Sequence, residues 1–146
     1  MRVEPEIKKQ FVAAGLVNLL FSHVLDHGTS SHMAHRAAEC AGQQDPLAFW
    51  QLHDLLFERQ GQLWNPTSEL LVGWAGELGL DPTAMASCLE DPATAALVER
   101  IDQERRDRGI RLRPTFEINE RLVEGAIAYE RFVQVFAEFG VEPVNE

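Results

Sequence analysis

A chain of 146 residues is long enough to bury a sizeable core and has the usual size of one domain. Its 13 basic and 23 acidic side chains give a net charge of −10, which argues against nucleic acid and anionic membrane surfaces as partners, because proteins that bind either are usually basic. Since the sequence contains no run of 18 apolar residues, we expect no segment that spans a membrane.

The beginning of the chain predicts a helix followed by a buried strand. Glu4–Ala14 reads as the helix, with Ile7 and Phe11 on one apolar stripe and Gly15 as its stop. Leu16–Val24 (LVNLLFSHV) is short and nearly all apolar, which is typical of a strand buried on both faces. A helix that leads into such a strand corresponds to the second half of a βαβ unit, and the sequence does not contain the first half.

The middle of the chain predicts a block of helices that begin at capping residues or at prolines. The predicted helices are about Ser31–Gln43, a helix from Pro46 to before the break at Asn65-Pro66, Thr67 or Ser68 to about Leu78, Pro82 to about Leu89, and Pro92 to about Arg108. Gly109 closes this block.

The end of the chain predicts a hairpin and an amphipathic helix. Two short strands, Thr115–Asn119 and Arg121–Glu124, flank a turn at Asn119-Glu120, and Phe116 and Ile118 alternate with polar residues, so one face of the first strand should be buried. The helix Ala128–Phe139 places most of its apolar side chains on one side. These side chains are Tyr129, Phe132, Val133, Phe136 and Phe139.

Pro114 lies at the first position of the hairpin, where a missing N–H is tolerated. Only X-Pro peptide bonds adopt the cis form at low cost, so Arg113-Pro114 is a candidate for it. The other reading is an ordinary trans proline that opens a hairpin.

The stretch Gly109–Gly125 (GIRLRPTFEINERLVEG), with the helices before it and the helix after it, closely resembles the C-terminal ββα half of the DsbA-type thiol–disulfide oxidoreductases. In that family the stretch usually reads like G-V-x-G-T-P-T-F with a cis proline, and residues 114–116 match it. Leu112 stands where a glycine is usual, and Arg113 where a threonine is usual. The helical block is similar too, in AAECAGQQ, Phe49-Trp50, LHDLLFERQGQLW and the Gly79-Leu80-Asp81 turn, so the resemblance extends from about Glu4 to about Phe139.

The resemblance implies an α/β, thioredoxin-like fold with a helical insertion and with the N-terminal strand missing. We expect a single domain over residues 1–146, in which about 31–108 is the helical insertion and 1–30 with 109–146 is the thioredoxin-like part. In the family the missing strand lies between the equivalents of Val17–His23 and Thr115–Asn119. An unfilled gap would leave buried backbone groups unpaired at roughly 1–3 kcal/mol each, so we expect a homodimer or a rearranged sheet.

Enzymes of this family work through a C-x-x-C motif at a helix N-terminus, where the pKa of one thiol is lowered. The two cysteines here, Cys40 and Cys88, lie inside predicted helices 48 residues apart, so no catalytic residue is assigned and no cofactor is expected. The resemblance implies that Arg113, Pro114 and Thr115 form the loop that helps to hold an extended polypeptide by backbone pairing.

Three states of Cys40 and Cys88 remain open at this point. A structural disulfide between them would close a 48-residue loop and contribute on the order of 4 kcal/mol, and some relatives carry an extra bridge at about this separation. Two buried free thiols are equally compatible with the sequence. A redox-reactive pair fits least well, because such cysteines are usually close in sequence and exposed.

The histidines and tryptophans have ordinary explanations. His23, His27, His32 and His35 lie close together in the sequence, but they match no known metal-ligand spacing, so we expect solvated or core histidines and no metal site. Trp50, Trp64 and Trp74 are expected to fill the core.

Two functions follow from these observations. The first is that of a DsbA-like thiol–disulfide oxidoreductase that lacks its own C-x-x-C and is inactive alone. The second is a non-catalytic thioredoxin-like module that binds a polypeptide substrate or a partner chain, as a dimer in one form of this hypothesis. The first ten residues contain no signal peptide, which predicts a cytoplasmic location for the sequence as it stands, or an extracytoplasmic one if an upstream segment is missing.

Overall fold

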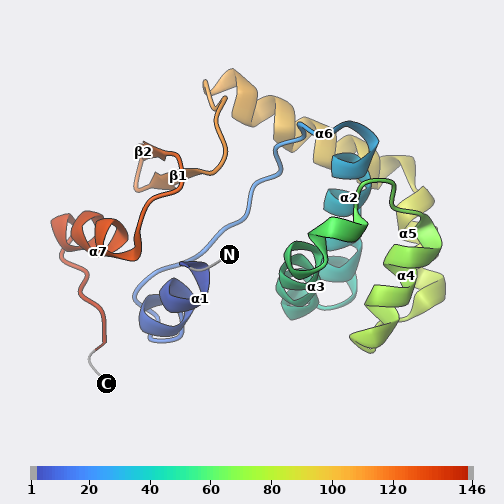
Figure 1. Ribbon diagram of the computed structural model, residues 1–146, viewed down its shortest axis with the longest axis horizontal. Helices are drawn as coiled ribbons and strands as arrows, with labels where there is room; N and C mark the ends of the chain where they lie inside the picture. Colours follow the sequence, from blue (N-terminus) through green and yellow to red (C-terminus); the bar gives the residue numbers. More distant parts are fainter. Residues whose placement is uncertain (1–2, 145–146) are drawn as a thin grey trace. The chain divides into compact units, whose positions relative to one another are not determined.

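The computed structural model describes residues 3–144 (Figure 1). The chain divides into two units. Residues 22–108 form one unit, called the helical unit here, and residues 1–21 together with 109–146 form the other, called the hairpin unit. The helical unit begins before residue 31, because the extended residues 22–26 and the first turn of its first helix belong to it.

The helical unit is built around its first helix. Its elements are α2 (Gly28–Gln44), α3 (Pro46–Glu58), the short 3₁₀ helix Gln60–Gln62, α4 (Ser68–Glu77), α5 (Pro82–Glu90) and α6 (Pro92–Asp107). Helix α2 contacts each of the other four α-helices of the unit. It can do so because small side chains on its buried side, Ala37, Ala38 and Ala41, allow close approach, and Leu52, Leu71 and Met85 from α3, α4 and α5 complete the core.

Four helices of this unit begin at the capping residues that the sequence indicates. The side chains of Asp45, Thr67, Asp81 and Asp91 each accept a hydrogen bond from a backbone N–H in the first turn of the helix that follows. Three of these helices have a proline in the first turn, where its missing N–H costs nothing. The predicted helix starts at residues 46, 82 and 92 are therefore confirmed.

The hairpin unit contains α1 (Glu4–Ile7), which continues as a π-helical turn over Lys8–Val12, the strands β1 (Thr115–Ile118) and β2 (Arg121–Glu124), and α7 (Tyr129–Glu138). Its core is largely aromatic. The rings of Phe11 and Phe136 are 4.8 Å apart, and those of Phe116 and Phe132 are 4.7 Å apart, both in edge-to-face arrangements. Such pairs add to the free energy gained by burial alone.

The hairpin has the predicted turn. Strands β1 and β2 are antiparallel, with Thr115 opposite Glu124 and Ile118 opposite Arg121. Asn119 and Glu120 both have positive φ, 46° and 71°, which is the conformation of a two-residue turn whose twist matches that of the strands.

The prediction of a strand over Leu16–Val24 is wrong. Leu16 lies in a bend and residues 17–24 form neither a helix nor a strand, and Leu20 is 85% exposed. Within residues 3–144 the sheet consists of β1 and β2 alone, so the segment has no neighbouring strand with which to form a ladder. A rearranged sheet is therefore not what the described residues form, whereas a homodimer stays a prediction.

Two further observations concern the surface. The expectation that all three tryptophans fill the core fails for Trp64, which is 88% exposed, whereas Trp74 is buried.

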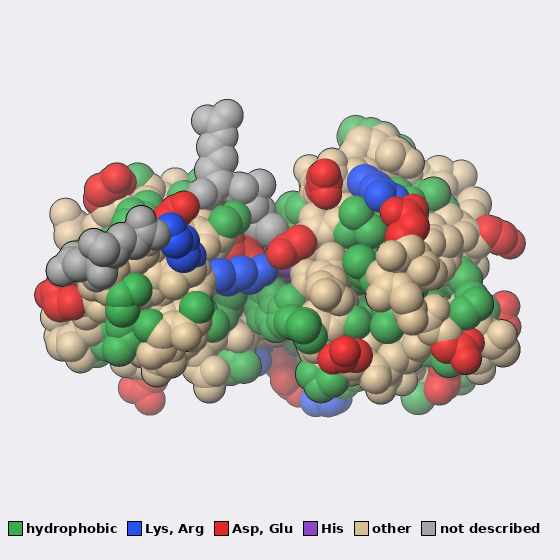
Figure 2. Space-filling view, turned by 90° about the horizontal axis from the view of Figure 1, so that it is seen from below, with side chains coloured by type: hydrophobic (Ala, Val, Ile, Leu, Met, Phe, Trp, Pro, Cys, Tyr) green, Lys and Arg blue, Asp and Glu red, His purple; other side chains and the backbone are tan. Residues whose placement is uncertain are grey.

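Figure 2 shows acidic, basic and hydrophobic side chains interspersed over the face that it draws. Among residues 3–144, none of the helices combines the length and apolar character that crossing a bilayer requires.

Candidate functional site

The loop before β1 is the part of the hairpin unit to which the sequence assigns polypeptide binding. Gly109 ends the preceding helical segment with φ +83°, and the Arg113–Pro114 peptide bond is cis. The Thr115 hydroxyl donates to the carbonyl oxygen of Leu112 at 2.7 Å, which fixes the turn around Pro114. The three predicted residues thus lie consecutively at the entrance of β1, with Arg113 and Pro114 exposed and Thr115 half-buried.

The hairpin register determines which backbone groups of this loop point away from β2. The Gly125 N–H donates to the Pro114 oxygen at 2.8 Å, so Pro114 and Gly125 face each other as a bonded pair. Bonded and non-bonded pairs alternate in an antiparallel ladder, which makes Thr115 and Glu124 a non-bonded pair. The backbone N–H and C=O of Thr115 are therefore directed to the outer edge of β1.

The two cysteines of the chain lie in the helical unit and form a disulfide. Cys40 on α2 and Cys88 on α5 have an S–S distance of 2.03 Å and a Cα–Cα distance of 5.7 Å. Cys40 is completely buried and Cys88 is half-buried, with the Thr94 hydroxyl oxygen 3.5 Å from its sulfur. The bridge joins α2 to α5.

This disulfide changes the description of the chain's sulfur chemistry. The expectation that the chain lacks a C-x-x-C of its own is not borne out as a description of its sulfur chemistry: no two cysteines have that spacing, yet the two cysteines present are joined to each other. Because thiol–disulfide exchange requires a thiolate to reach a sulfur, the buried Cys40 is closed to direct attack, and only the half-buried Cys88 offers a sulfur to an outside thiolate.

A cluster of histidines on the helical unit is the feature that the sequence did not indicate. His23, from the extended segment before α2, is 1% exposed and forms two contacts with α2. Its Nδ1 lies 2.8 Å from Nδ1 of His35, and its Nε2 lies 2.6 Å from Oε1 of Glu39. Of the other histidines considered together with these, His27 is paired with Asp26 and His32 with Glu99. The four-residue spacing of His35 and Glu39 places both on one helix face, but it does not indicate that His23 contacts them.

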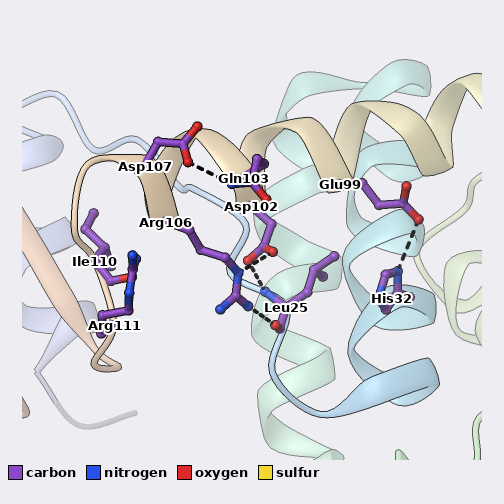
Figure 3. A network of polar contacts seen from close by, with 9 residues as sticks. All are labelled: Leu25, His32, Glu99, Asp102, Gln103, Arg106, Asp107, Ile110 and Arg111. Atoms are coloured by element: carbon purple, nitrogen blue, oxygen red, sulfur yellow. Dashed lines mark hydrogen bonds and ion pairs between the residues drawn. The ribbon is translucent and has the colours of Figure 1, made fainter.

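The same extended segment is held by α6 through a second set of polar contacts. The Leu25 N–H donates to Oδ1 of Asp102 at 2.7 Å, and the Arg106 Nε donates to Oδ2 of the same carboxylate at 2.7 Å (Figure 3). The Arg106 guanidinium also donates to the Leu25 carbonyl oxygen. The hydrogen bond and charge of Asp102 raise the pKa of Arg106. The Asp102 carboxylate and the Arg106 guanidinium thus form hydrogen bonds with both backbone groups of Leu25.

Comparison with known proteins places these features in a family. A family model described as Thioredoxin matches residues 1–137. Disulfide bond formation protein D of Bacillus subtilis (strain 168) is 28% identical to this chain over 134 residues, which are 86% of this chain and 58% of that protein. A Na(+)/H(+) antiporter NhaA of Herminiimonas arsenicoxydans is 35% identical over 102 residues, which are 70% of this chain and 16% of the antiporter.

The crystal structure of oxidised BdbD from Bacillus subtilis is similar to this fold, with a TM-score of 0.84 at 26% identity, and the match covers 94% of this chain and 76% of the BdbD chain. The thioredoxin-like fold with a large helical part is therefore confirmed. This chain spans 58% of the length of disulfide bond formation protein D. The chain belongs to the thioredoxin family, as a DsbA-like homologue of disulfide bond formation protein D.

Proposed function

We propose that this chain binds extended polypeptides at the loop of Arg113, Pro114 and Thr115, as the substrate-holding part of a DsbA-like thiol–disulfide oxidoreductase. The observation that carries the proposal is the outer edge of β1, the side on which the family's missing strand lies. Among the described residues this edge has no neighbouring strand, so an extended chain can pair there with the backbone of Thr115, which is directed away from β2. The exposed Arg113 and Pro114 beside it leave room for such a ligand.

The disulfide supports an extracytoplasmic location for this function. Disulfides persist in oxidising compartments and are rare in the cytosol. The Cys40–Cys88 bridge has a structural role in this proposal, in which it holds α2 and α5 together while another dithiol exchanges with the substrate.

The two units correspond to the two parts of one domain in this proposal. The helical unit is the insertion, and the hairpin unit is the thioredoxin-like part that carries the binding edge. A second copy of the chain could pair with the same β1 edge, so homodimer formation and polypeptide binding would compete. Dilution should therefore increase the fraction of chains that can bind a polypeptide.

Binding to the β1 edge can be measured by fluorescence anisotropy with a labelled, unfolded polypeptide whose cysteines are alkylated, so that thiol exchange does not contribute. Thr115→Pro removes the outward N–H of Thr115, and the loss of one backbone hydrogen bond, about 1 kcal/mol, should weaken binding about fivefold. Glu124→Pro is the matched control, because Glu124 faces Thr115 and directs its N–H to the outer edge of β2.

A change in the ligand tests the same contact without altering the protein. A polypeptide whose amide nitrogens are methylated cannot donate to a strand edge and should bind several-fold more weakly than its unmethylated form. Equal binding of both forms, or equal effects of Thr115→Pro and Glu124→Pro, would contradict the proposal.

A non-catalytic binding module is the second candidate, and the lack of a C-x-x-C in this sequence favours it for this chain taken alone. In an insulin-reduction assay the chain should show no more turnover than its Cys40→Ala/Cys88→Ala variant. Turnover that the double variant loses would mean that the Cys40–Cys88 pair itself exchanges with substrates.

A further inference from the structure

The extended segment Ser22–Asp26 joins the hairpin unit to the helical unit in sequence, and two independent sets of polar contacts dock it onto the helices. The first is the histidine contact between His23 and α2, and the second is the grip of Asp102 and Arg106 on the backbone of Leu25. Leu25 itself is 8% exposed. The first set includes two imidazole rings, which change charge at mildly acidic pH.

The contact between the two imidazole rings limits how many protons they can hold. At an Nδ1–Nδ1 distance of 2.8 Å, one nitrogen must donate a proton and the other must accept it. The His23 Nε2 faces the Glu39 carboxylate at 2.6 Å and is therefore the protonated nitrogen on that side. The pair satisfies this geometry when both rings are neutral, and again when one of them is an imidazolium. When both rings are imidazolium, two N–H groups point at each other and the contact is lost.

We propose that the segment Ser22–Asp26 is an acid-sensitive latch, which is released from α2 when the His23–His35 pair takes up its second proton. Each protonation adds one proton from solvent to a ring nitrogen and forms or breaks no other covalent bond. Release separates two imidazolium rings that would otherwise face each other at hydrogen-bond distance.

The charged groups around His35 come from every element packed against it. The docked segment contributes His23 and Asp26, α3 contributes His53, and α6 contributes Asp102, which is itself paired with Arg106. His23 and His53 oppose a positive charge on His35, whereas Asp26 and Asp102 favour it. The burial of the ring also opposes the charge and is the largest single effect. Glu39 on α2 compensates a charge on His23 and does so through its contact with Nε2, on the far side of that ring from His35.

The direction of the pH effect follows from these surroundings. Burial, followed by the proximity of His23, lowers the pKa of His35 from 6.5 to about 4. A released His35 is exposed and keeps a pKa of about 6.5, so the released state binds more protons than the docked state between these values. The docked state is therefore fully favoured above pH 6.5 and is progressively lost as the pH falls from 6.5 towards 4.

Amide hydrogen exchange of the full chain, followed by NMR, measures docking directly through the Leu25 N–H. After correction for the intrinsic pH dependence of exchange, the protection of this amide should fall tenfold or more between pH 7 and pH 4.5. The amide of Leu71, in the core of α4, should keep its protection over the same range. That reference separates release of the segment from acid unfolding of the whole unit.

Two variants assign the effect to the histidine pair. His35→Gln keeps a polar side chain that does not titrate, and it should remove most of the fall in Leu25 protection. His32→Gln is the matched control, because His32 lies on the same helix and is 39% exposed, and it should behave as the wild type. A full pH effect in His35→Gln would overturn the proposal.

If His35→Gln releases the segment at every pH, the wild-type protein still decides the question. The ring signals of His35 and the protection of Leu25 must then change over the same pH range. Titration of the His35 ring without any loss of Leu25 protection would overturn the proposal.

Discussion

The two units of this chain differ in how completely their own helices and strands pack against and hydrogen-bond to one another. In the helical unit a central helix is surrounded by four others, four helix starts are capped by side chains, and a disulfide closes the core. In the hairpin unit two four-residue strands are the entire sheet of the described residues, and no residue of either strand is fully buried. The helical unit is built for stability, whereas the hairpin unit keeps a strand edge that a ligand can use.

This difference teaches where function can reside in a small α/β protein. The backbone N–H and C=O groups inside a helix already form hydrogen bonds with one another. They are therefore not available to a ligand. A two-stranded hairpin leaves one edge of each strand available. Since all three tryptophans lie in the helical unit and the single tyrosine, Tyr129, lies in the hairpin unit, the two can be followed separately.

The largest expected effect is a loss of stability in the helical unit. The Cys40→Ala/Cys88→Ala variant removes a bridge that closes a 48-residue loop, and the free energy of unfolding should fall by about 4 kcal/mol, since the cross-link restricts the unfolded chain. Tryptophan fluorescence during urea unfolding measures this loss. A ¹⁹F label on Tyr129 should keep its native signal at low urea; its simultaneous loss would mean that the two units unfold as one.

The next largest effect comes from one core side chain. Leu52 on α3 is completely buried, so Leu52→Ala should cost about 2–5 kcal/mol through lost burial and the cavity left behind. Leu47→Ala on the same helix removes the same atoms from a side chain that is 62% exposed and should change stability by less than about 0.5 kcal/mol. Similar losses for both variants in tryptophan-detected unfolding would refute the packing of α3 described here.

The smallest effect concerns the hairpin turn and has the opposite sign. Glu120 has φ +71°, a conformation that costs a non-glycine residue roughly 1 kcal/mol, so Glu120→Gly should stabilise the hairpin by about 0.5 kcal/mol after the entropy of glycine is subtracted. Glu117→Gly, within β1, should instead destabilise it by about 0.5–1 kcal/mol. The ¹⁹F signal of Tyr129 during urea unfolding distinguishes the two signs.

Much of this architecture could be predicted because it is specified locally. Asp45, Asp81 and Asp91 each precede a proline, and this pair of residues indicates a helix start without any knowledge of the rest of the chain. The turn at Asn119-Glu120 and the loop at Pro114 are local in the same sense.

The errors arise where the outcome depends on distant residues. Leu16–Val24 has the composition of a buried strand, but a strand exists only with a neighbour, and the described residues provide none. The contact of His23 with His35 and Glu39 joins a segment outside the helices to a helix face. The residues next to each of them in the sequence therefore do not reveal it. The state of Cys40 and Cys88 is likewise decided by the packing of α2 on α5.

Polypeptide binding at the β1 edge is the central claim, and mapping of backbone amide shifts by NMR tests it most directly. When the alkylated unfolded polypeptide is added, the amides of Arg113, Thr115 and Glu117 should shift most, and the amides of α3 and α4 should stay unchanged. Shifts confined to the helical unit, or none at saturating polypeptide, would contradict the claim.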